Sequence, residues 1–163
     1  MSIVKKLDDL LKKSKIKYEK ITHAETFTSQ ETAQVEHIPG RELAKVVMVK
    51  ADGKDVMMVV SGHHKVDLGK AKKLLKAKDV RLATEQEFIS LFPDCEKGAM
   101  PPFGGLYDVP FYVDKTIAEN DTIVFNAGTH RESIKMAYKD YEKVVQCIRK
   151  SMKYKMTNNR KQK

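Results

Sequence analysis

The chain has 163 residues, 41% of them apolar, and a net charge of +9, which fits one globular domain with a real hydrophobic core. No apolar run approaches the roughly 20 residues of a membrane span, and residues 1–6 lack the continuous apolar stretch of a secretory signal. Cys95 and Cys147 have no CxxC or metal-type spacing. We therefore expect a cytoplasmic protein with reduced thiols, no membrane association, no metal and no cofactor.

The first quarter of the chain predicts two helices and a strand between them. Residues 3–14 carry apolar side chains along one stripe and lysines largely off it, which indicates an amphipathic helix. Residues 17–22 predict a short strand. Thr28 and Glu31 then have the spacing of a capping box, so a helix of about two turns should follow and end at Pro39-Gly40.

The next segment predicts a β-hairpin. Two apolar runs, residues 46–49 and 56–60, flank Asp52-Gly53, a pair that favours a primed turn because both positions tolerate positive φ. The runs are apolar on both faces, so other elements should cover each side of this hairpin.

The second half alternates short strands and helices. Asp67 and Thr84 each stand at the start of a helical pattern, and a Gly- and Pro-rich loop covers residues 93–106. Further strands are expected at 80–82 and near 110–113, 122–126 and 134–138, before a helix over 140–152. The irregular mixture predicts a single α/β domain with a mixed β-sheet, curled or barrel-like, surrounded by helices.

The C-terminal segment is strongly basic. Residues 149–163 hold seven lysines and arginines and no acid, which leaves the first 148 residues at +2. Such a segment can bind the phosphates of a polyanion, or it can be a solvated terminus. We expect a domain over residues 1–152 and a flexible basic tail over 153–163.

Lys45 is the first candidate for chemistry. Period-2 alternation places it on the same face of its strand as Val47 and Val49. A lysine among valines is costly unless its ammonium reaches a polar pocket or an anion. Alternatively, Lys45 marks the exposed end of the strand and extends to water.

A stiff loop and a glycine turn are the other two candidates. Residues 98–106 combine two prolines with three glycines, so their backbone can approach a ligand and donate N–H groups to an oxyanion; a rigid connector without a ligand is the alternative. After residues 122–126, a turn at Gly128 presents Thr129 and His130, an imidazole suited to handling protons or orienting a substrate. A lone histidine after a turn is otherwise a surface or locally bonded residue.

The order of these segments resembles a known family. Residues 23–33 resemble its His-x-x-x-x-Thr-x-x-Glu-x-Ala opening, and residues 43–50 resemble its lysine-bearing strand. Residues 100–104 are similar to its Pro-Phe-Gly loop, and residues 126–130 to its Gly-x-His turn. This is the YbaK/EbsC and ProX family, which includes the editing domain inserted into bacterial prolyl-tRNA synthetases.

The resemblance implies a free-standing deacylase that hydrolyses the ester between a wrong amino acid and the terminal ribose of tRNA. Its partners would be aminoacyl-tRNA and, as a further candidate, an aminoacyl-tRNA synthetase. The resemblance makes Lys45 and His130 the catalytic residues. The substrate-binding residues that it implies come from the opening motif, the loop and the turn: Thr28, Gly98, Met100, Pro102, Phe103, Gly104, Gly105, Gly128 and Thr129.

One departure and two alternatives bear on this reading. Met100 replaces a small polar residue of the family loop, so the amino acid is not assigned. A non-catalytic module that binds aminoacyl-tRNA is the main alternative, and a general RNA-binding protein is a weaker one because no stacking motif is present. The deacylase hypothesis expects Lys45, the loop and His130 to converge on a single cleft.

Overall fold

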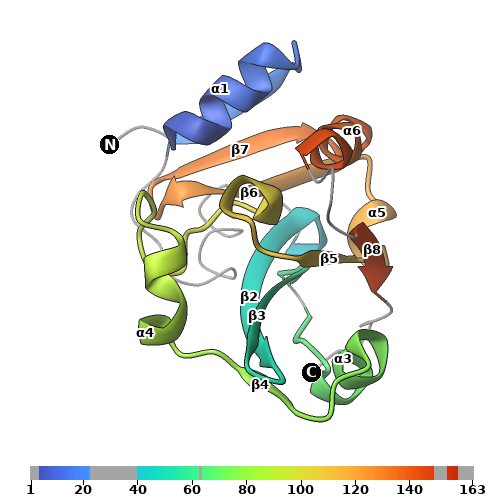
Figure 1. Cartoon of the computed structure of the whole chain (residues 1–163). Coiled ribbons are helices and arrows are strands. Elements are labelled where there is room, and N and C mark those ends of the chain that lie inside the picture. Colours follow the sequence, from blue (N-terminus) through green and yellow to red (C-terminus); the bar gives the residue numbers. More distant parts are fainter. Residues whose placement is uncertain (1–3, 23–39, 63, 149–153, 158–163) are drawn as a thin grey trace.

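The computed structural model describes residues 4–22, 40–62, 64–148 and 154–157 (Figure 1). Its centre is a mixed β-sheet, flanked by helices on both faces. The capping box predicted at Thr28 and the helix after it lie outside the described residues.

The sheet contains eight strands. Seven follow the order β1-β7-β6-β2-β3-β5-β8, and β4 pairs with β2 beside this path. β2 pairs in parallel with β6, as β3 does with β5 and β5 with β8, whereas the other pairs are antiparallel. The order starts at β1 and ends at β8, so this is an open mixed sheet and not a closed barrel. The strands are β1 (Tyr18–Thr22), β2 (Leu43–Ala51), β3 (Lys54–Ser61), β4 (Val80–Leu82), β5 (Phe111–Asp114), β6 (Thr122–Thr129), β7 (Glu132–Ala137) and β8 (Tyr154–Thr157).

The predicted hairpin is formed by β2 and β3. Asp52 and Gly53 have φ values of 50° and 83°, as a primed turn requires. The carboxylate of Asp52 also accepts hydrogen bonds from the backbone N–H groups of Lys78 at 3.0 Å and Asp79 at 2.9 Å. The turn is therefore fastened to the segment that leads into β4.

Helices cover the two faces of this hairpin. The α-helices are α1 (Lys5–Lys13), α3 (Leu68–Leu75), α4 (Glu85–Phe88), α5 (Lys115–Ala118) and α6 (Tyr138–Ile148), and the short 3₁₀ turns are η1 (Gly40–Glu42), η2 (Ile89–Leu91) and η3 (Gly104–Tyr107). α1 and α6 pack on the larger core, whereas α3 covers a smaller core made by the other face of β2 and β3. The expected coverage of both faces is confirmed.

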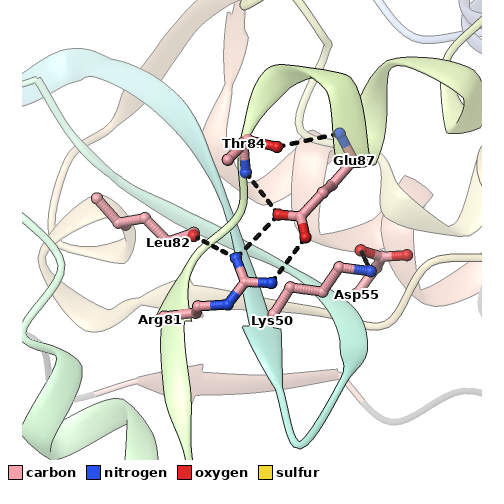
Figure 2. Close-up of polar contacts among 6 residues, drawn as sticks. All are labelled: Lys50, Asp55, Arg81, Leu82, Thr84 and Glu87. Carbon is pink, nitrogen blue, oxygen red and sulfur yellow. Dashed lines mark hydrogen bonds and ion pairs between the residues drawn. The ribbon is translucent and has the colours of Figure 1, made fainter.

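Both predicted N-caps in the second half are present. The Asp67 side chain accepts a hydrogen bond from the backbone N–H of Lys70 at the start of α3. Thr84 and Glu87 form the complete capping box of α4, and the guanidinium of Arg81 binds the same Glu87 carboxylate at 2.7 Å (Figure 2).

Several features differ from expectation. α6 begins at Tyr138, two residues earlier than predicted, and β6 extends to Thr129, so the glycine turn belongs to a strand that contains a bulge. α5 and β8 were not predicted. Within the segment expected to be a flexible tail, residues Tyr154–Thr157 pair with β5; the boundary at residue 152 and the flexibility of 153–163 stay predictions.

Candidate functional site

Lys45 lies in a pocket on the α3 side of the sheet. β6 pairs with β2 only at Leu43 and Ala44, and β4 pairs with it at 49–51, so Lys45 lies between the two partners along that edge. The pocket has a volume of about 240 Å³ and is lined by Lys45, Val47, Lys65, Val66, Leu68 and Leu82. The predicted alternation, with Lys45 and Val47 on one face, is thereby confirmed.

The pocket is apolar apart from two amines. Burial lowers the pKa of Lys45, and the nearby charge of Lys65 lowers it further. No carboxylate belongs to the pocket lining within the described residues. Lys50, also on β2, shows the contrast, because its ammonium pairs with Asp55 at 2.8 Å (Figure 2). A half-buried amine without such a partner is suited to an anion supplied by a ligand.

The glycine–proline loop is tied to the core. Ala99, Met100, Pro101, Pro102, Phe103 and Gly104 are all buried. Met100 is 3% exposed and Phe103 is not exposed at all, and the Phe103 ring packs edge-on against Phe125 and Tyr141. The Tyr141 hydroxyl also donates to the Pro102 carbonyl at 2.6 Å. A ligand could therefore meet this loop through its backbone and not through these side chains.

The turn after β6 is joined to the start of that loop. Nε2 of His130 lies 2.5 Å from the Lys97 carbonyl oxygen, and the His130 backbone N–H donates to the Glu96 carboxylate at 2.8 Å. Gly128 donates its N–H to the Ala99 carbonyl at 2.9 Å. His130 as a whole is buried, at 7% exposed. In this geometry His130 fixes residues 96–99 against the turn.

Two motif glycines are required by packing. A Cβ at Gly104 would lie 2.5 Å from the backbone oxygen of Val109, and a Cβ at Gly128 would lie 2.2 Å from Cγ2 of Val4. Gly98 differs, because its φ of +79° favours glycine while its Cβ position stays 3.7 Å from the His130 ring.

The structure brings together only part of the predicted site. Gly98, Gly128, Thr129 and His130 lie at one junction, but the side chains of Met100 and Phe103 enter the larger core, whereas Lys45 faces the smaller one. The pleat of β2 points Ala44 and Met48 toward the larger core and Lys45 toward the smaller one, so Lys45 and the Met100 and Phe103 side chains lie on opposite faces of this strand. The convergence of Lys45, the loop and His130 on a single cleft stays a prediction. Thr28 lies outside the described residues.

Of the six lining residues, sequence reasoning assigned only Lys45 to a site. Lys65 and Leu82 enter the pocket from the segments before α3 and in β4, and Leu82 is 55% exposed, an unusual position for a large apolar side chain. The sequence signal was the apolar residue of a short strand expected at 80–82, but only the β2–β4 pairing places it beside Lys45.

Comparison with known proteins decides the family. Residues 23–144 match the profile of the aminoacyl-tRNA editing domain. The chain belongs to the aminoacyl-tRNA editing domain family. The resemblance seen in the sequence is thereby confirmed, and aminoacyl-tRNA editing is the role of this family.

Relatives of the editing domain occur within larger enzymes. The chain is 27% identical over 115 residues to a proline–tRNA ligase of Staphylococcus haemolyticus, and 30% identical over 113 residues to one of Staphylococcus aureus. These alignments cover 69% and 68% of the chain but 20% and 19% of the ligases. The chain thus spans about a fifth of the length of these relatives.

Solved structures share the fold of the editing domain. A proposed trans-editing enzyme for prolyl-tRNA synthetase matches with a TM-score of 0.75 at 22% identity, over 96% of this chain and 98% of that one. A hypothetical protein matches with a TM-score of 0.78 at 16% identity, over 94% and 99%. Among the described residues, none of the helices is long and apolar enough to cross a membrane.

Proposed function

We propose that this editing domain is a deacylase that removes a wrongly attached amino acid from tRNA. Water would attack the ester carbonyl carbon, the bond from that carbon to the ribose oxygen would break, and the ribose oxygen would leave with a proton. The products are a free amino acid and uncharged tRNA. An aminoacyl ester is already activated, so positioning a water molecule and stabilising the oxyanion can suffice without a protein nucleophile.

The observation that carries this proposal, beside the family, is the Lys45 pocket. Its amine stands among apolar walls, where the effective dielectric constant is lower than in water and a charge acts more strongly on a nearby anion. Lys45 would contact the substrate near the scissile carbonyl or the terminal phosphate. Burial is the largest cause of the lowered pKa of Lys45, so an anion brought by the substrate would stabilise its charged form.

The loop and the turn have a supporting role in this proposal. His130 is bonded through Nε2 to the Lys97 carbonyl, so we assign it as a positioning residue that holds residues 96–99 in place. The backbone of residues 98–105 would then offer N–H groups to the aminoacyl end of the substrate. Because the loop is fastened by Tyr141 and Gly128, those groups would be preorganised.

The test is release of amino acid from a panel of mischarged tRNAs, with mischarged prolyl-tRNA species first. We expect turnover by the native chain and a loss of at least about 100-fold in Lys45→Ala, in the range that removal of one preorganised donor costs. Lys54→Ala is the matched control, because Lys54 is an exposed lysine of the same hairpin. Its turnover should be unchanged.

Three outcomes would count against the proposal. Binding of aminoacyl-tRNA without turnover would support a non-catalytic module. Equal binding of any RNA would support a general RNA-binding protein. Full activity in Lys45→Ala would remove the pocket from the mechanism.

A further inference from the structure

Positive charge is concentrated around α3. Residues 65–81 hold seven lysines and arginines but two aspartates, a net of five positive charges. The first 148 residues together carry only +2, so the rest of that stretch is net negative by three. The segment around α3 is therefore strongly positive and is distinct in sequence from the basic C-terminal segment.

The lysines of residues 65–81 face solvent. We define the α3 ridge as Lys72, Lys73, Lys76 and Lys78, all of which are exposed. The α3 residues that cover the smaller core are Leu68, Ala71 and Leu75, none of which belongs to the ridge. Lys72 and Lys73 lie in the last turn of α3, and Lys76 and Lys78 follow its end, so the ridge gathers four cations within seven residues of the chain.

Ion pairing distinguishes the ridge from α1, which is also rich in lysine. On α1, Lys5 pairs with Asp9 at 2.8 Å and Lys12 with Asp8 at 3.0 Å. For the ridge lysines, no ion pair with an acid occurs in the part of the chain that the structure describes. Of the two aspartates in the segment, Asp67 is engaged in capping α3. The ridge charges are thus available to an external polyanion.

The ridge adjoins the Lys45 pocket. Lys65 and Leu68, which precede and begin α3, line that pocket, and β4, which follows α3, contributes Leu82 to it. Figure 1 shows α3 and β4 together at one end of the molecule and α1 at the other. A nucleic acid whose end enters the pocket would therefore pass over or beside α3.

We propose that the α3 ridge binds the sugar–phosphate backbone of the acceptor stem of tRNA and so delivers the aminoacylated end to the Lys45 pocket. This inference rests on the proposed function for its substrate. Lysine ammonium groups suit phosphates, because such contacts release counterions and need no base recognition. The ridge thus supplies affinity for the RNA duplex, and the pocket supplies chemistry.

The test measures binding of uncharged tRNA as a function of salt. The ridge variant is Lys72→Gln/Lys73→Gln/Lys76→Gln, and the control is Lys13→Gln/Lys15→Gln/Lys17→Gln, which removes the same charge from exposed lysines at and after the end of α1. If each ridge lysine meets one phosphate, the slope of log K against log salt should become shallower by about 2–3 in the ridge variant. Affinity at 0.1 M salt should fall roughly 10- to 100-fold, against less than about 3-fold in the control.

Two shorter RNAs locate the contact. A hairpin that contains only the acceptor stem should show the same loss of affinity, whereas a single-stranded oligonucleotide of the 3′ end should bind both variants and native protein alike. In deacylation, the ridge variant should show a raised KM with kcat retained. Unchanged Tm in both triple variants checks that folding is intact.

The outcomes separate this inference from the proposed function. Equal losses in ridge and control variants, or none in either, would overturn the ridge, even if the native chain deacylates tRNA. A ridge-dependent salt slope in a chain without deacylation would uphold the ridge and overturn the enzyme. If the ridge variant lost binding to an acidic protein but bound RNA as tightly as the native chain, the assignment of the ridge to RNA would also be overturned.

Discussion

Alanine at position 128 would collide with the segment that begins α1. Gly128 has φ +105°, and a Cβ there would lie 2.2 Å from Cγ2 of Val4, which is buried and also donates its N–H to Ala127 at 3.0 Å. Gly98 provides the matched comparison, since its φ is +79° but its added Cβ would meet nothing closer than 3.7 Å. Comparing Gly98→Ala with Gly128→Ala therefore separates the cost of backbone strain from the cost of the collision with Val4.

The expected loss of stability in each variant follows from backbone strain and from the collision with Val4. Backbone strain at a positive φ costs about 1–2 kcal/mol, so Gly98→Ala should lower the free energy of unfolding by that amount. Gly128→Ala adds overpacking against Val4, typically about 1–3 kcal/mol, for a total of about 2–5 kcal/mol. Urea unfolding curves of the full chain, followed by circular dichroism, measure both values.

A second substitution tests the cause. Val4→Ala removes Cγ2, so Gly128→Ala/Val4→Ala should be less destabilised than the sum of the two single variants by about 1–2 kcal/mol. The reasoning is wrong if Gly128→Ala costs no more than Gly98→Ala, or if the two substitutions at positions 4 and 128 are additive. Gly128 would then serve some need other than the packing of α1.

Three further predictions concern charge. Lys45→Met should abolish deacylation yet stabilise the fold, because an apolar side chain replaces a half-buried ammonium. The gain in the free energy of unfolding should be about 1 kcal/mol, which corresponds to a rise in Tm of roughly 2–4 °C; a lower Tm by calorimetry would contradict this. Lys65→Gln removes a nearby positive charge and should therefore raise the pKa of Lys45. The part of the pH–rate profile of deacylation that reflects the titration of Lys45 should then move to higher pH, and an unchanged profile would count against this prediction. Hydrogen bonds from Arg81 and from the Thr84 backbone lower the pKa of Glu87 to about 2, so its contribution to stability is present above pH 4.5 and lost as pH falls through about 2. In a carboxyl NMR titration Arg81→Ala should raise that pKa but leave it below 4.5, since the Thr84 bond remains.

Local rules predicted the elements that depend on few neighbouring residues. The primed turn at Asp52-Gly53 follows from the tolerance of these two residue types for positive φ, and the Asp67 and Thr84 caps follow from side chains that satisfy free N–H groups. The boundaries of β4 agree with the expected 80–82. For the turn and the two caps, the energy that decides the structure comes from within about four residues, whereas β4 also depends on its pairing with β2.

Elements that depend on distant partners were missed or misplaced. α5 is a single turn capped by Asp114, too short to give an apolar period, and β8 is a four-residue strand defined by its pairing with β5. The open order of the sheet depends on which strands pair, which no local pattern encodes. Lys65 was missed as a pocket residue for the same reason.

The position of Met100 changes how its departure from the family loop should be read. At 3% exposed, Met100 fills the larger core, so exchanging a small polar residue for methionine at this position alters packing and does not place a new side chain before a ligand. Under the proposed function, a ligand in the Lys45 pocket would meet the side chains of Val47, Val66, Leu68 and Leu82. A pocket that distinguishes ligands by one methylene gains only about 1–3 kcal/mol, so selectivity in such a pocket depends on these apolar walls, while the two amines give the same attraction to every ester.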